Sequence, residues 1–137
     1  MAVHNITYKN KEVDSQINTE LGKAFPFFKK LKIGTIGSRR LIIENFSEGL
    51  DQLKMNVSGI QYGNIELRPL GIIVHINKGI YTYAWTIPFY YLSIFNSDFF
   101  TLHSQGEFIQ FNKIKSMKEN KTFIHKLIEL KANFNPQ

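Results

Sequence analysis

An alternation of apolar and polar residues between Ile65 and Phe111 limits the possible folds of this chain more than any other feature. A period of two is typical of β-strands that bury one face. Turn-forming residues interrupt the alternation, for instance Asn77-Lys78-Gly79, whose glycine suits a hairpin turn. We therefore predict short strands at 65–68, 72–76 and 80–87, the last two joined in a hairpin, followed by a closely spaced meander of three more at 91–95, 99–103 and 107–111.

Aromatic residues concentrate in the third of these strands. Tyr81, Tyr83 and Trp85 share one face with Ile87, because alternate side chains of a strand point to the same side. Rings in strands usually fill a core or face a covering helix. If the three rings are instead exposed together, they form an apolar patch of the kind that marks a partner surface. The sequence leaves both interpretations open.

Helices are predicted at both ends of the chain. After residues 1–12, which we interpret as a loose arm or an edge strand, apolar residues recur at helical spacing over 14–32, and Pro26 interrupts or shortens this helix. Ser116 and Glu119 form a capping box that predicts the start of a C-terminal helix. The apolar stripe of that helix comprises Phe123, Ile124, Leu127, Ile128, Leu130 and Phe134.

The segment between the N-terminal helix and the first predicted strand is ambiguous. The apolar run 41–43 is too short to distinguish a strand from the start of a helix. Gly59 and Gly63 predict turns on either side of residues 60–62. One or two helical turns are suggested by the spacing of Phe46, Leu50 and Leu53.

The length of 137 residues fits a single domain, 1–137. The absence of cysteine excludes disulfides and thiolate metal sites, and the N-terminus has no apolar run of a secretory signal, so we expect a cytoplasmic protein. The stretch Gly79–Ser97 is uncharged and about long enough to cross a bilayer. Its many hydroxyl and amide groups favour two strands joined at Pro88 over a transmembrane helix.

A family resemblance covers residues 71–134. Trp85-Thr86-Ile87-Pro88 is followed by Leu92-Ser93-Ile94, by the meander to Phe111 and by the helix to Phe134. This order resembles the C-terminal two thirds of pleckstrin-homology-like domains, particularly small bacterial ones of unassigned role. The resemblance implies a strongly bent antiparallel sheet or partly open barrel with a helix across one end. It implies no particular ligand, because that fold serves lipid, peptide and protein binding.

The chain departs from that family before Ile65, where its first strands are not evident and the N-terminal helix is extra. This departure leaves open how the sheet begins.

A basic loop, residues 29–40, is the strongest candidate site. Residues 34–37 have the Gly-X-X-Gly form seen in KH domains, where glycines let the backbone approach nucleic acid. In a pleckstrin-like fold the same loop would suit an anionic lipid head group or another phosphate ligand. The alternative without a ligand is a surface turn whose basic side chains are solvated. The candidate anion-binding residues are Lys29, Lys30, Lys32, Gly34, Gly37, Arg39 and Arg40.

Catalytic and metal sites have little support in the sequence. The histidines lack the short spacing of a metal site, although His75 and His103 would approach each other and Glu66 or Glu107 if their strands present the same face. There is no Gly-X-Ser-X-Gly elbow and no P-loop. A wet helical face is predicted for the acids Glu44, Glu48 and Asp51. We expect no catalytic residue, metal, cofactor or enzymatic activity.

These patterns predict an α+β domain in which a C-terminal helix covers a bent antiparallel sheet. We expect a non-catalytic binding or adaptor module for protein partners, with self-association through an exposed sheet edge as one form of that recognition. The alternative is binding of phosphate, anionic lipid or nucleic acid through the basic loop, which the net charge of +6 would favour.

Overall fold

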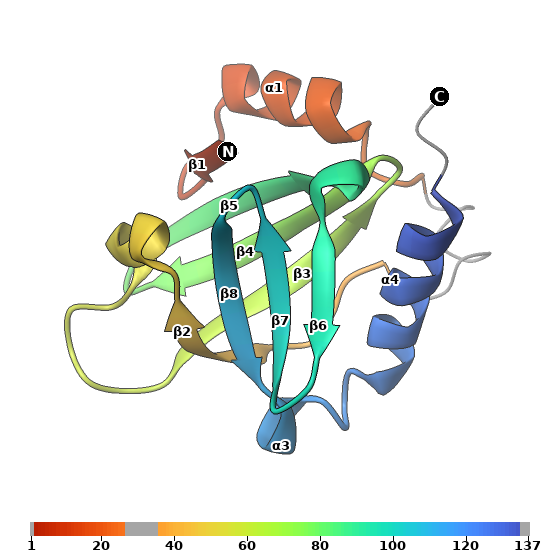
Figure 1. Ribbon diagram of the computed structural model, residues 1–137. Coiled ribbons are helices and arrows are strands. Elements are labelled where there is room, and N and C mark those ends of the chain that lie inside the picture. The colour runs from red at the N-terminus through yellow and green to blue at the C-terminus, as the bar shows by residue number, and fades with distance from the viewer. Residues whose placement is uncertain (1, 27–35, 135–137) are drawn as a thin grey trace.

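A computed structural model describes residues 2–26 and 36–134. Its centre is an antiparallel sheet with the strand order β1-β5-β4-β3-β2-β8-β7-β6 (Figure 1). The predicted α+β class, antiparallel sheet and C-terminal helix are confirmed. The strands are β1 Ala2–Asn5, β2 Leu41–Phe46, β3 Gln61–Arg68, β4 Gly71–Lys78, β5 Tyr81–Pro88, β6 Ser93–Asn96, β7 Phe99–Ser104 and β8 Glu107–Asn112. The helices are α1 Lys11–Leu21, α3 Lys113–Ser116 and α4 Lys121–Asn133, with 3-10 turns η1 Glu48–Leu53 and η2 Phe89–Tyr91.

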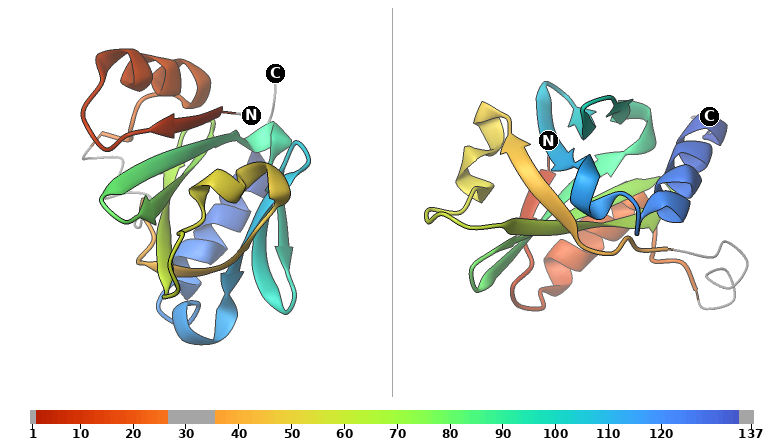
Figure 2. Two further views of the ribbon diagram at one scale, coloured as in Figure 1. Left: turned by 90° about the vertical axis from the view of Figure 1, so that its left-hand side faces the viewer. Right: turned by 90° about the horizontal axis from the view of Figure 1, so that it is seen from below.

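Strand β2 joins the two halves of the sheet. It pairs with β3 on one side and with β8 on the other, and its register with β8 shifts between Ile43 and Asn45. An irregularity of this kind bends a strand and increases its twist. The meander β6–β8 therefore lies across β3–β5 (Figures 1 and 2). The sheet remains open, because among the described residues β1 and β6 each pair with a single strand.

The main core lies between the two halves and beneath α4. Trp85, Phe100 and Phe111 are its largest fully buried side chains, and α4 contributes Phe123, Ile124 and Leu127. The question of the three strand aromatics is thereby answered. Trp85 is core, Tyr83 is half-buried against it, and Tyr81 is exposed, so the rings do not form a common surface patch.

Helix α1 packs on the opposite face of the sheet. Its Ile17 and Leu21 form a small second cluster with Ile73 and Ala84 of β4 and β5. The helix begins three residues before the predicted start, because the side chain of Asn10 accepts hydrogen bonds from the first-turn amides.

The end of α1 also differs from the prediction. It ends at Leu21 because Gly22 takes a positive φ of 82°, a conformation that suits glycine at a helix C-terminus. Before it, the edge-strand interpretation of the N-terminal residues is confirmed by β1, which pairs with β5.

Two boundary predictions were wrong. Gly63 does not form a turn but lies inside β3, where a side chain would come 2.8 Å from the carbonyl oxygen of His75. The proposed capping box does not start the C-terminal helix either: α3 ends at Ser116, and α4 begins at Lys121 with Asn120 as its N-cap. The ambiguous run 41–43 belongs to strand β2, and helical turns follow it in η1.

The uncharged stretch does not form a transmembrane helix. Gly79–Ser97 contains β5, η2 and β6, as two strands joined near Pro88 require. Within the described part of the chain, no helix has the length and apolar character needed to cross a membrane.

Candidate functional site

The predicted basic loop is only partly described. Lys29, Lys30, Lys32 and Gly34 lie outside the described residues. Gly37 forms an isolated bridge with Glu66, and its φ is not in the left-handed region. Gly37 is therefore not required by backbone conformation, which weakens the Gly-X-X-Gly interpretation. Arg39 and Arg40 follow it as exposed residues that lead directly into β2.

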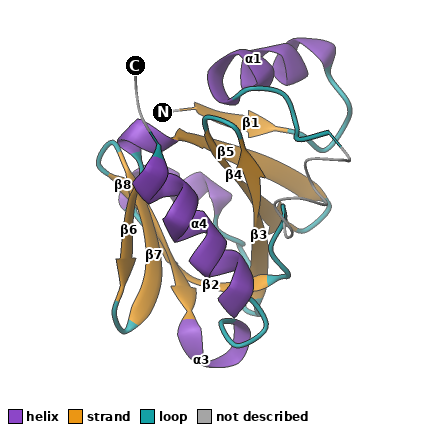
Figure 3. Cartoon of the chain, turned by 90° about the vertical axis from the view of Figure 1, so that its right-hand side faces the viewer, coloured by secondary structure: helices purple, strands orange, loops and turns teal. Residues whose placement is uncertain are grey.

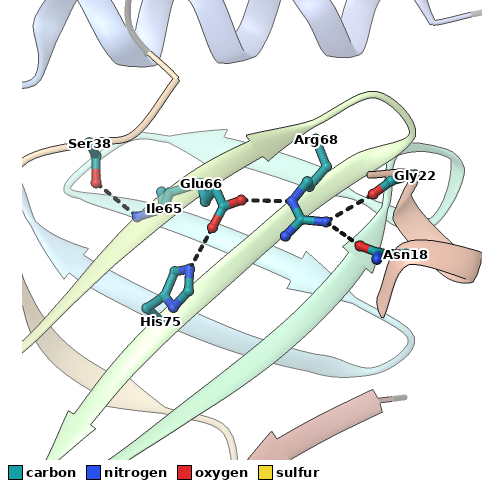
Figure 4. Close-up of polar contacts among 7 residues, drawn as sticks. All are labelled: Asn18, Gly22, Ser38, Ile65, Glu66, Arg68 and His75. Carbon is teal, nitrogen blue, oxygen red and sulfur yellow. Dashed lines mark hydrogen bonds and ion pairs between the residues drawn. The ribbon is translucent and has the colours of Figure 1, made fainter. Parts of the chain in front are cut away.

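The backbone that carries the two arginines is held on both sides. Ser38 donates its N–H to the carbonyl of Ile65 at 2.8 Å, and its hydroxyl accepts from the Ile65 amide at 2.8 Å (Figure 4). On the other side, Asn120 accepts from the Arg39 amide through Oδ1 at 2.8 Å. Asn120 is buried, so this bond is shielded from water. The start of β2 is thus fixed to both β3 and α4.

A depression opens beside these arginines. Its volume is about 570 Å³, and the residues that line it are Ser38, Arg39, Arg40, Ile42, Tyr62, Asn64 and Glu119. The guanidinium of Arg40 lies over the ring of Tyr62, 4.3 Å from the ring centroid. This distance is typical of a cation–π contact. The depression therefore combines two cations, one of them positioned by an aromatic ring, with hydroxyl and amide groups.

A second polar cluster lies further along the outer face of β3 (Figure 4). Glu66 Oε2 is 2.6 Å from Arg68 Nε, and Glu66 Oε1 is 3.0 Å from His75 Nε2. Burial by itself raises the pKa of Glu66, but the hydrogen bonds and charges of His75 and Arg68 outweigh it and lower that pKa to about 2. Glu66 is therefore a firmly ionised acceptor.

This cluster connects the sheet to α1. Arg68 also donates through Nη1 to Asn18 Oδ1 at 3.1 Å and to the Gly22 carbonyl at 2.9 Å. Both oxygens of the Glu66 carboxylate are occupied by protein donors. The arrangement holds the end of α1 in place against the sheet.

The histidine prediction is confirmed in part. His75 meets Glu66, whereas His103 lies on β7 with its ring edge-on to Phe95. Glu107 accepts from the Ser47 hydroxyl instead of meeting a histidine. Across the described residues, no three histidine or acidic side chains are placed to hold a metal ion together.

The three acidic residues predicted on one solvent-exposed helical face lie on two different elements. Glu44 lies on β2, and Glu48 and Asp51 lie on η1. All three are exposed, as expected for solvated acids.

The structure also shows a groove that the sequence analysis missed. It lies between the end of β6 and α4 (Figures 1 and 3), has a volume of about 360 Å³, and is lined by Asn96, Met117, Lys118, Lys121, Ile124, His125 and Ile128. Phe95 of β6 and Ile128 of α4 are exposed although both are large and apolar. Ile128 at the margin of the helical stripe was the available signal, but the sequence does not place it opposite β6.

Comparison with known proteins adds no family assignment. No family model matches the chain, and no curated protein or solved structure matches it. Inferences about function therefore depend on the geometry of the depression and the groove.

Proposed function

We propose that this chain is a non-catalytic binding module with a pleckstrin-homology-like fold, and that it recognises an extended segment of a partner protein. The segment would add a strand to β6 and place a side chain in the groove beside α4. The order of elements supports the fold assignment. From Gly71 onward, the hairpin β4–β5, the meander β6–β8 and a C-terminal helix follow one another in the order that the resemblance implies.

The observation that carries this proposal is the position of β6. Its register with β7 runs from Ser93 opposite His103 to Asn96 opposite Phe100. No described strand pairs with its other side. Backbone amides and carbonyls on such an edge provide hydrogen-bonding groups for an incoming strand. A four-residue edge is short, so the added strand needs further contacts for affinity.

The groove provides those contacts. Met117 is half-buried, Ile124 is buried and Ile128 is exposed, so the apolar surface extends from the core to the outside of α4. An apolar side chain from the partner would cover this surface, which the hydrophobic effect favours. Lys118 and Lys121 are exposed beside it and would favour acidic residues next to the apolar one.

The proposal can be tested with peptides selected from a random phage-displayed library. A selected peptide, added to the isotopically labelled protein, is expected to shift the amide resonances of β6 and α4. Ile128→Glu should weaken its binding by roughly tenfold or more, because it places a charge in an apolar contact. Ile128 is already exposed, so the variant should remain folded.

Ile114→Glu is the matched control. Ile114 is exposed on α3 and does not line the groove. Equal loss of peptide binding in both variants, or resonance shifts confined to other elements, would contradict the proposal. A concentration-dependent dimer that Ile128→Glu abolishes would instead identify a second copy of this chain as the partner.

A further inference from the structure

The arginines of the depression have no described acidic partner. Within residues 2–26 and 36–134, the ion pairs of 4.0 Å or less join Arg68 and His75 to Glu66, and Lys126 to Glu129. Arg39 and Arg40 are in none of them. Glu119 lines the same depression but makes no ion pair with either. The N–H groups of two guanidinium ions are thus available to an anionic ligand.

The Tyr62 contact orients one of these cations and leaves its donors available. The guanidinium carbon of Arg40 lies over the ring of Tyr62, 4.3 Å from its centroid. A guanidinium carries five N–H donors, and a contact with a ring face accepts none of them through a lone pair. The contact therefore restricts the motion of Arg40, which lowers the entropy cost of binding.

The neighbouring arginine is restrained through its backbone. The amide of Arg39 is bonded to the buried Asn120, and the preceding Ser38 is bonded to Ile65. Arg39 and Arg40 both line the depression, which also presents the amide of Asn64 and the ring of Tyr62.

From these features we infer that the depression binds a phosphate monoester carried by a small polar ligand. Two guanidinium ions can donate to several oxygens of one tetrahedral group, whereas a carboxylate is satisfied by a single fork. A monoester also carries close to two negative charges at neutral pH, so the two arginines attract it more strongly than a singly charged group, against the opposing charge of Glu119 in the same lining. The volume of about 570 Å³ leaves room for the group to which the phosphate is attached. Asn64 and Glu119 would bond to polar atoms of that group.

This inference does not depend on strand addition at β6, because the two sites share no lining residue. The same monoester chemistry is found on soluble metabolites and on phosphatidic acid in a membrane. The experiment therefore has a soluble arm and a vesicle arm.

The soluble arm titrates the labelled protein with glycerol 3-phosphate, with glycerol as the uncharged comparison. The expected result is a shift of the Arg39 and Arg40 side-chain Nε–H resonances with the phosphate and none with glycerol. Arg40→Ala should weaken binding by roughly tenfold or more, the loss of at least one charge-assisted hydrogen bond. Lys9→Ala removes the same charge at an exposed position outside the depression and should leave binding unchanged.

The vesicle arm uses phosphatidylcholine vesicles with and without phosphatidic acid. Binding that requires phosphatidic acid and is lost in Arg40→Ala would support the inference and assign the monoester to a lipid. Absence of binding in both arms would overturn it. The inference would also be overturned if a single-stranded oligonucleotide without a terminal phosphate bound more tightly than glycerol 3-phosphate, because this would indicate a nucleic-acid surface. Binding by Arg40→Lys as tight as that of the unmodified protein would overturn the role of the guanidinium donors, since lysine keeps only the charge.

Discussion

The carboxylate of Glu66 and the guanidinium of Arg68 meet at 2.6 Å on the outer face of β3. The two residues are two positions apart, so their side chains point to the same side of the strand. The same guanidinium reaches the last turn of α1 and the glycine that ends it. The ion pair within β3 therefore helps to attach α1 to the sheet, although Asn18 and Arg68 are 50 positions apart in sequence.

The pH dependence of stability should report this pair. Because the pKa of Glu66 is lowered to about 2 in the folded protein from an ordinary value of 4.5, the ionised form stabilises the fold above about pH 5. This contribution should be lost as the pH falls from about 5 towards 2. We expect its size to be about 3 kcal/mol, measured as the free energy of urea unfolding at a series of pH values.

Glu66→Gln isolates this effect from the other carboxylates. The difference in free energy of unfolding between the unmodified protein and this variant should be largest near pH 7 and should vanish near pH 2, where Glu66 itself becomes neutral. A difference that stays constant over this range would show that ionisation of Glu66 does not contribute.

Removal of the Arg68 side chain should release α1. Arg68→Ala removes the ion pair with Glu66 and the bonds to Asn18 and Gly22, at an expected cost of about 2–3 kcal/mol. Hydrogen exchange should accelerate most in the amides of α1, because a small apolar cluster and the bond from the Leu70 amide to the Leu21 carbonyl then remain to hold this helix. Arg39→Ala, at an exposed position, is the control and should leave exchange in α1 unchanged. Equal protection of α1 in both variants would contradict the assigned role of Arg68.

Substitutions at Trp85 should show how ring volume and the buried indole N–H each affect the free energy of unfolding. The side chain is fully buried, and within the described residues its indole N–H has no hydrogen-bond partner. Trp85→Phe removes this unsatisfied donor, which offsets part of the cost of the smaller ring. We expect a loss of about 1 kcal/mol or less, against about 3–5 kcal/mol for Trp85→Ala. Trp85 is the only tryptophan of the chain, so both variants lose tryptophan fluorescence, and their unfolding should be followed by circular dichroism. A loss in Trp85→Phe well above about 1 kcal/mol would show that removal of the indole N–H does not offset the smaller ring.

Much of the sheet could be predicted because its pattern is local. From Ile72 to Phe111 each strand is a short apolar-rich run that pairs with a neighbour in sequence, so these runs and the turn residues between them were sufficient. Strand β2 was not evident, because its apolar run is short and its pairing with β8, at the other end of the meander, leaves no local signal in the sequence. Gly63 was interpreted as a turn because glycine does not distinguish a turn from a close approach of two backbones, and only the position of β4 shows which applies.

The candidate sites show the same division. Arg39 and Arg40 were found from charge alone, but Tyr62 and Asn64 line the depression only because β3 pairs beside β2. Asn120 reaches Arg39 across 81 positions of sequence. The groove between β6 and α4 likewise depends on where the helix crosses the sheet, which no local pattern specifies.

Gly71 should tolerate no side chain, since three elements converge on it. It is buried at the start of β4, opposite Pro88 of β5, and a Cβ at this position would overlap the carbonyl oxygen of Ile87 and lie 2.8 Å from a methyl group of Leu21 in α1. Because backbone atoms cannot move aside as a flexible side chain can, Gly71→Ala should cost about 2–4 kcal/mol in the free energy of urea unfolding.

Gly37→Ala is the comparison for this prediction. The nearest atom to a Cβ there is the carbonyl oxygen of Ile65 at 3.9 Å, and the backbone does not require a positive φ. This variant should be neutral or more stable by about 0.5 kcal/mol, because alanine restricts the unfolded chain. It should also bind glycerol 3-phosphate as the unmodified protein does, since the donors of Arg39 and Arg40 are unchanged. Comparable destabilisation by the two substitutions would show that the close contacts around Gly71 are relieved by movement of β5 or α1.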